Sequence, residues 1–135
     1  FYRLGRGYQK LKKLPEAIAA LSKSTELKND YFNSFNSLGQ IYQAQENYMK
    51  AYQMFRTAIR IKPDNYLAHR NLAISFEHMN LSAQGNIDDI DQVIANWNKF
   101  LKVAKNNPRA KRLISETEEH IKDLQELKEY QQEEL

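Results

Sequence analysis

The sequence of 135 residues contains no cysteine, only three prolines and only four glycines. Without cysteine the chain cannot form disulfides, a thiolate metal site or a cysteine nucleophile. An all-β protein needs many turns rich in glycine and proline, so their scarcity favours helices. No run approaches the roughly 18–20 consecutive apolar residues that cross a bilayer, so membrane insertion is not expected. With 41% hydrophobic and 27% charged residues, the composition is that of a soluble globular domain.

The chain starts with Phe1 instead of methionine, and its charge is unevenly distributed. We interpret it as a fragment or a processed chain, so its compartment is not predicted. Lys and Arg exceed Asp and Glu by 6 in residues 1–65, balance them in 66–107 and fall short by 3 in 108–135. This gradient favours an acidic partner or head-to-tail self-association, although ordinary solvated helix surfaces would also produce it.

A 34-residue period organises the chain. The segment FYRLGRGY at 1–8 recurs as FNSLGQIY at 35–42, and a less similar copy follows one period later. Apolar positions within each unit follow the i, i+3, i+4, i+7 spacing of amphipathic helices. Gly39 and Ala51 are small enough for two helix backbones to approach closely, with Phe55 filling the space around them. Two helices in each unit predict a stacked solenoid in which units contact mainly their neighbours.

Residues 32–65 resemble the tetratricopeptide repeat (TPR), in which a Trp-like residue, Leu-Gly, Tyr, Ala, Phe, Ala and Pro stand at fixed offsets. The matching residues are Phe35, Leu38, Gly39, Tyr42, Ala51, Phe55, Ala58 and Pro63. The resemblance implies an all-α fold, a right-handed α-solenoid of helix-turn-helix repeats with about seven helices. A single TPR domain would cover residues 1–135. Its parts would be repeat 1 (1–31, truncated at its N-terminus), repeat 2 (32–65), repeat 3 (66–110) and a C-terminal capping helix (108–135).

The third unit departs from the pattern by about 11 extra residues, because Pro108 follows Pro63 by 45 residues instead of 34. Apolar residues at helical spacing begin at Ile87. We therefore predict that the second helix of this unit begins near Asn86 to Asp88, with Asn86 as its N-cap, and ends near Asn106, two turns or more longer than its equivalents. The aspartates after the N-cap would lie in its first turns, where the helix dipole favours them. They lack the glycine and the final glutamate of a calcium loop, so no metal site is predicted.

Residues 108–135 carry a narrow apolar stripe on an otherwise charged helix. The stripe consists of Leu113, Ile114, Thr117, Ile121, Leu124 and Leu127. We interpret this helix as a cap over the apolar end of the solenoid, against which Ile87, Ile90 and Ile94 would pack. A dimerising coiled coil is the alternative, but two heptads fall short of the three or four that would indicate one.

The sequence contains no arrangement of residues suited to catalysis or to a cofactor. Of the three histidines, His69 and His78 are nine residues apart on one helix, which is not the spacing of a metal pair, and His120 is remote in sequence. No glycine-rich phosphate loop is present. Basic residues of the first half are spread over two helices without interleaved aromatics, so nucleic-acid binding is not expected. We predict a non-enzymatic protein without a cofactor.

In TPR proteins one side of the first helix of each repeat lines a concave groove, and the resemblance implies that side chains of this chain lie there. They are Arg3, Arg6, Lys10, Asn33, Asn36, Gln40, Gln43, Arg70, Asn71, Ile74 and His78. Asn and Gln can pair with the backbone of an extended peptide, and Arg adds charge-assisted bonds to carboxylates. Among all positions on this side only Glu77 is acidic. Because exposed helix faces are polar in any case, an ordinary surface is the alternative.

Some TPR domains hold the C-terminal carboxylate of chaperone tails with Lys, Asn and Arg residues at fixed offsets. Asn71 stands at one of these positions, but Asn36 and Gln40 stand where Lys and Asn would be needed, so this ligand is not predicted. We predict a scaffold that binds a protein or peptide partner, of acidic character, in the groove. Homo-oligomerisation and a regulatory role within a larger multidomain protein are the alternatives.

Overall fold

The computed structural model describes residues 1–133, which form seven α-helices and one short 3-10 helix. The elements are α1 (Tyr2–Lys10), α2 (Leu14–Leu27), α3 (Phe32–Ala44), α4 (Tyr48–Ile61), α5 (Tyr66–Asn80), α6 (Ile90–Ala104), the 3-10 helix η1 (Pro108–Ala110) and α7 (Lys111–Glu133). The predicted all-α solenoid of seven helices is confirmed. The last two residues of the predicted domain and capping helix, 134–135, lie outside the described residues.

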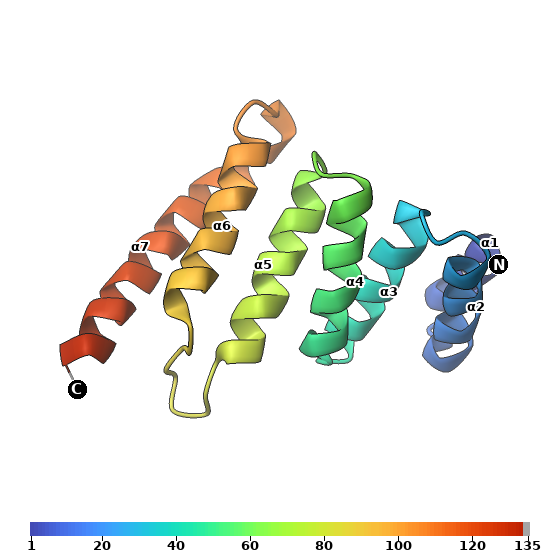
Figure 1. The fold of residues 1–135 in the computed structure, drawn as a ribbon, viewed down its shortest axis with the longest axis horizontal. Coiled ribbons are helices and arrows are strands. Elements are labelled where there is room, and N and C mark those ends of the chain that lie inside the picture. Colours follow the sequence, from blue (N-terminus) through green and yellow to red (C-terminus); the bar gives the residue numbers. More distant parts are fainter. Residues whose placement is uncertain (134–135) are drawn as a thin grey trace.

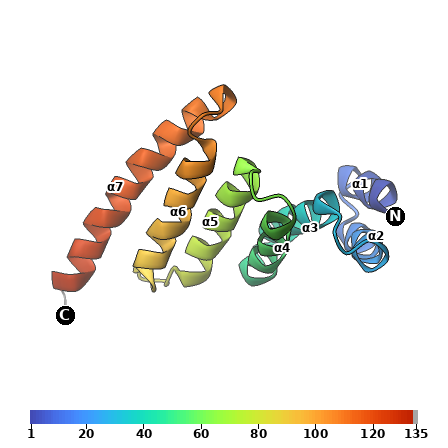
Figure 2. The same cartoon turned by 45° about the horizontal axis from the view of Figure 1, so that its top comes forward.

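The helices lie in a row with the two termini at opposite ends (Figure 1). Their axes change direction along the row, so that α4 is viewed nearly end-on where α6 and α7 are viewed from the side (Figure 2). Between Leu81 and Ile87 there is an isolated β-bridge, and no β-strand occurs in residues 1–133. No helix in this part of the chain combines the length and the apolar character needed to cross a bilayer.

Glycine is required where α3 crosses α4. A Cβ atom added to Gly39 would lie 2.7 Å from Cε1 of Phe55, whose ring is fully buried. The same contact recurs one period earlier, where a Cβ on Gly5 of α1 would clash with Leu21 of α2. Both glycines therefore hold their helix pairs close together, as the repeat predicts.

Side-chain caps and prolines set several helix boundaries. Asn47 caps α4 by accepting a hydrogen bond from the backbone N–H of Lys50 (3.4 Å), and Asn65 caps α5 in the same way through Ala68 (2.9 Å). Pro15 stands in the first turn of α2, where its missing N–H costs no helical hydrogen bond.

The hydrophobic core is divided into clusters that each join neighbouring helices. One contains Leu21 of α2 with Leu38 and Ile41 of α3, and another joins α3, α4 and α5 around Phe32 and Ala58. The largest cluster lies between α5, α6 and α7. This arrangement is typical of a solenoid, in which stability comes from contacts between adjacent units.

The prediction for the start of the second helix in the third unit is wrong. The helix α6 begins at Ile90, and its N-cap is Asp89, which adopts a left-handed conformation (φ 52°) and makes no side-chain cap. With 15 residues α6 is only one residue longer than the 14 residues of α4. Most of the insertion instead lengthens the connection between α5 and α6, which has nine residues (81–89) where α3 and α4 are joined by three.

This connection folds back on itself and is held by the last helix. The backbone N–H of Ile87 donates to Oε1 of Gln131 in α7 (2.7 Å), and Nε2 of Gln131 donates to the Ile87 carbonyl (3.1 Å). Gly85 has a φ of 85°, which permits the turn. Ile87 is thus a buried residue (6% exposed) that lies in a loop. Its spacing of three residues from Ile90 is nevertheless the spacing of two residues on one side of a helix.

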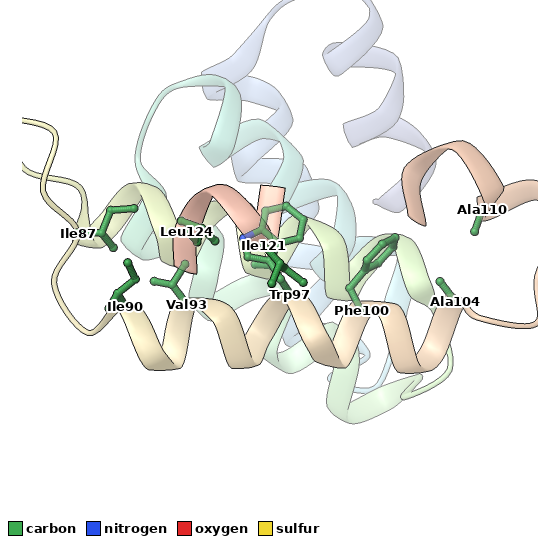
Figure 3. Packing of buried hydrophobic residues seen from close by; sticks show 10 residues of the cluster. Ile87, Ile90, Val93, Trp97, Phe100, Ala104, Ala110, Ile121 and Leu124 are labelled. Carbon is green, nitrogen blue, oxygen red and sulfur yellow. The ribbon is translucent and has the colours of Figure 1, made fainter. Parts of the chain in front are cut away.

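The prediction that this apolar stretch packs against the final helix is confirmed. Ile87 and Ile90 are buried in one cluster with Ile121 and Leu124 of α7, and Ile94 packs against the same cluster (Figure 3). Figure 3 shows the buried side chains of α6 along one side of that helix, directed toward its neighbours. The α7 helix therefore covers the apolar side of α6.

Candidate functional site

The first helices of the units, α1, α3 and α5, are connected to one another by polar side chains. Nη1 of Arg6 in α1 donates to Oγ of Ser37 in α3 (3.4 Å). Nε2 of Gln43 in α3 donates to Oγ of Ser75 in α5 (3.5 Å). Hydrogen bonds at these distances are long and weak, so they leave the surface able to rearrange around a ligand.

The other predicted groove residues of α1 and α3 differ in exposure. Arg3 and Lys10 are exposed, whereas Asn33, Asn36 and Gln40 are half-buried. The Oδ1 atom of Asn36 is buried and has no hydrogen-bond partner within residues 1–133. An unsatisfied buried acceptor is unfavourable.

In α5, Asn71 is half-buried, and His78 stacks on Tyr48 of α4 with 4.5 Å between the ring centres. Three of the predicted residues of this helix line one cavity.

This cavity, of about 350 Å³, lies between α5 and α7 with α6 at its base; we call it the α5–α7 pocket. It is lined by Arg70, Ile74, Glu77, His78, Trp97, Glu116, Thr117 and His120. Arg70, Ile74 and His78 were predicted as groove residues, and Glu77 was noted as the one acidic residue among them. The residues from α6 and α7 were not predicted.

The carboxylate of Glu77 lies at the centre of a hydrogen-bond network in this pocket. Its Oε1 atom accepts a hydrogen bond from Nε1 of Trp97 (2.9 Å) and another from Nε2 of His120 (2.7 Å). The rings of Trp97 and His120 meet edge to face with 5.3 Å between their centres. Three helices thus converge on a single carboxylate, which fixes the geometry of the pocket.

Both titratable partners of this network have shifted pKa values. Burial alone would raise the pKa of Glu77, but the hydrogen bonds from His120 and Trp97, with the charges of His120 and His78, bring it below its ordinary value. The hydrogen bond to Glu77 raises the pKa of His120, burial opposes this rise, and the charges of Glu77 and Asp123 add to it. The pair is therefore an ion pair at mildly acidic pH.

We expect the contribution of this pair to stability to depend on pH. The raised pKa of His120 gives stability that is complete below its ordinary value of 6.5 and is lost as the pH rises through the folded-state pKa. The lowered pKa of Glu77 gives stability that is present above its ordinary value of 4.5 and is lost as the pH falls through the folded-state pKa. The difference in unfolding free energy between wild type and His120→Gln should therefore be largest between pH 4.5 and pH 6.5.

Urea denaturation of both proteins at several pH values measures this difference. His69→Gln is the matched control, because His69 bonds to the carbonyl oxygen of Pro63 (2.8 Å) and not to a carboxylate. A difference for His120→Gln that stays constant from acidic to alkaline pH would show that the ion pair does not form.

The α5–α7 pocket combines an apolar wall with groups of both charges. Ile74 and Trp97 are apolar surfaces, Arg70 is a cation, and Glu116 is a carboxylate. In residues 1–133 no group of three or more His, Cys, Asp or Glu side chains is placed to hold a metal ion. Such a pocket can accept a side chain of a ligand by contact and hydrogen bonding.

Comparison with known proteins decides the family. The tetratricopeptide repeat model matches residues 32–65, and a second model of the same repeat matches residues 1–31. Residues 1–65 are tetratricopeptide repeats. The two TPR matches cover α1 to α4, while α5 and α6 continue the same helix-pair arrangement beyond them. As a TPR protein the chain is a protein-interaction module.

Solved structures have the same fold. The Yersinia enterocolitica type III secretion translocator chaperone SycD superposes with a TM-score of 0.80 at 15% identity, covering 95% of this chain and 83% of SycD. The N-terminal domain of stress-induced protein-1 (STI-1) from C. elegans gives a TM-score of 0.72 at 15% identity, covering 92% of this chain and 91% of that one. The search of curated proteins found no match. At this level of identity the likeness concerns the fold alone.

The pocket residues of α7 were not predicted, because the sequence pattern of that helix indicates a cap or, as the alternative, a dimerising coiled coil. Thr117 belongs to the predicted apolar stripe, but the sequence predicts no role for Glu116 or His120. In the TPR solenoid α7 follows α6 as a first helix would follow in a further unit, so its inner side continues the surface of α5. With the offset of 45 residues between the third unit and α7, the groove position of Asn71 corresponds to Glu116, but Thr117 and His120 correspond to Leu72 and Ser75, which are not groove positions.

Proposed function

We propose that this TPR protein is a non-enzymatic scaffold that binds an extended peptide segment of a protein partner along the inner sides of α1, α3 and α5. The α5–α7 pocket would anchor one side chain of that segment. The observation that carries the proposal is the convergence of Arg70, Ile74 and His78 with residues of α6 and α7 around a cavity of about 350 Å³. This volume is within the range of ligand-binding clefts, roughly 300–1,000 Å³.

The remainder of the groove supports a polar peptide backbone as the ligand. Asn36 and Gln40 carry amide groups, which can both donate to and accept from a main chain. The long hydrogen bonds of Arg6 and Gln43 could be exchanged for bonds to a ligand at little cost. SycD, which shares the fold, is described as a translocator chaperone, which is consistent with a protein as the ligand.

The test begins with peptides selected on the wild-type protein from a random 12-residue display library. The affinity of a selected peptide is then measured by fluorescence polarisation for the variant Arg6→Ala/Asn36→Ala/Gln40→Ala/Arg70→Ala. We expect a loss of about tenfold or more, because two charge-assisted contacts and two amide contacts disappear.

The matched control removes two basic and two amide side chains that are exposed elsewhere, Lys13, Lys111, Gln125 and Gln132. It should retain the wild-type affinity. Equal affinity of the groove variant and the wild type, with helical content intact by circular dichroism, would place the peptide site elsewhere.

Self-association is a second candidate, favoured by the exposed apolar side of α1. Leu4 is 50% exposed, whereas Leu38, its equivalent one period later, is 3% exposed. Phe1 and Leu11 are also exposed, so the end of the row presents apolar surface. Sedimentation over a range of concentrations tests this candidate: a dimer that Leu4→Glu/Leu11→Glu dissociates would support it, and a monomer at high concentration would exclude it.

A further inference from the structure

A second cavity lies on the other side of α5, where α4 and α6 flank it; we call it the α4–α6 groove. Its volume is about 420 Å³. At 100° per residue, its α5 residues His69 and Leu72 are on the side of the helix opposite Arg70 and Ile74. The α4–α6 groove is therefore separate from the proposed peptide site.

Three permanent cations converge on the α4–α6 groove. Arg56 and Arg60 are one turn apart on α4, and Lys99 comes from α6. An adjoining cavity of about 350 Å³ is lined by the same two arginines together with Gln53 and Thr57 of α4. Like charges brought together in this way repel one another, so an anionic ligand would be favourable.

Within residues 1–133, no carboxylate neutralises these cations. Neither cavity is lined by any Asp or Glu. None of the ion pairs found within residues 1–133 involves Arg56, Arg60 or Lys99. The Arg56 guanidinium lies 5.7 Å from the ring centre of Tyr52, a contact that leaves its N–H donors available.

Polar groups beside the cations add further donors. Asn96 is only 6% exposed, and its Oδ1 accepts a hydrogen bond from Nε2 of Gln92 (3.1 Å). The amide nitrogen of Asn96 makes no hydrogen bond within the described residues, so a donor remains in the groove wall. His69 is held by its own hydrogen bond to Pro63 at the same edge. Carboxylates, which only accept hydrogen bonds when ionised, match this set of donors.

We propose that the α4–α6 groove binds an acidic peptide segment of a protein partner, with carboxylates of the segment paired to Arg56, Arg60 and Lys99. Arginine pairs with carboxylates through two parallel N–H···O bonds, which gives specificity as well as affinity. The aromatic side chains that line the groove are those of Tyr52 and His69. A nucleic-acid surface would need a longer basic track with several stacking rings. A protein ligand also fits a chain that is a protein-interaction module.

The test uses a fluorescein-labelled nonapeptide of alternating Glu and Ala, and a matched peptide with Gln in place of Glu. Fluorescence polarisation at low salt should show the Glu peptide binding about tenfold or more tightly than the Gln peptide, with an affinity that falls as salt is added. The variant Arg56→Ala/Arg60→Ala/Lys99→Ala should lose this preference. These three side chains are exposed, so the fold should be retained; Arg60→Glu/Lys99→Glu serves as a second variant.

The control variant Lys13→Ala/Lys105→Ala/Lys111→Ala removes the same charge at exposed positions outside the groove and should retain the preference. Equal losses in both triple variants would overturn the proposal, because net charge alone would then explain binding. A loss caused by the Arg6/Asn36/Gln40/Arg70 variant and not by the groove variant would also overturn it and would favour the inner surface. Tighter binding of a single-stranded DNA nonamer, or self-association that the groove variant abolishes, would likewise assign the groove to another occupant.

Discussion

Replacing Phe55 with alanine is expected to lower the free energy of unfolding by about 3–5 kcal/mol. The ring of Phe55 is fully buried between α3 and α4, and the helices around it cannot close the space completely. Domains have net stabilities of about 5–15 kcal/mol, so this loss removes a large fraction and should lower the melting temperature by about 10 °C or more. Urea denaturation followed by circular dichroism measures it. Phe1→Ala is the control: Phe1 is 60% exposed, and its loss should change stability by about 0.5 kcal/mol or less.

A second substitution, Gly39→Ala, tests whether the ring of Phe55 packs directly against Gly39. In wild type, Gly39→Ala places a Cβ 2.7 Å from the Phe55 ring, and such overpacking costs about 1–3 kcal/mol. Alanine favours a helix over glycine by about 1 kcal/mol, which offsets only part of that cost. In the Phe55→Ala background the clash is absent, so Gly39→Ala should stabilise. An effect of the same sign in both backgrounds would contradict the packing described.

The second large effect is expected for Ile90→Asp at the start of α6. Ile90 is 8% exposed and lies in the cluster with Ile121 and Leu124. A carboxylate there would be buried without a partner, which costs about 3 kcal/mol or more. An acidic residue in the first turn of a helix gains only about 0.3–1 kcal/mol from the helix dipole, so burial dominates. Thermal and urea denaturation measure the loss.

Ile90→Val is the conservative control, for which removal of one methyl group should cost about 0.5–1.5 kcal/mol. Unchanged stability of Ile90→Asp would mean that this side of α6 is open to solvent. The stripe formed with Ile87 and Ile94 would then be a candidate partner surface instead of part of the core.

The fold was predictable where local spacing and packing agree. The positions of Gly39, Ala51 and Phe55 in the repeat determine how α3 meets α4, and the structure has that contact. The start of α6 was not predictable in this way. Ile87 fits the helical spacing of the residues after it, but Gln131, 44 residues away in sequence, binds its backbone in a loop. Periodicity records which residues are apolar, and a loop residue buried by a distant partner looks the same as a helical one.

The candidate site was predictable only in part for a related reason. Arg70, Ile74 and His78 follow from the repeat positions of α5. Their convergence with Trp97 and His120 depends on how α6 and α7 are placed against α5, which is a tertiary contact without a sequence signature. The α4–α6 groove was not predicted, because its cations come from α4 and α6 and are brought together only when the chain folds.

The double hydrogen bond between Gln131 and Ile87 links two segments that could otherwise fluctuate independently. Repeat arrays open locally from their ends, and the final turns of α7 would be expected to fray. The amide of Ile87 is protected by Gln131 on that helix and not by a neighbour in its own loop. Its exchange with solvent deuterium would therefore report the opening of α7, and a ligand that orders the end of α7 would slow exchange in a loop it does not touch.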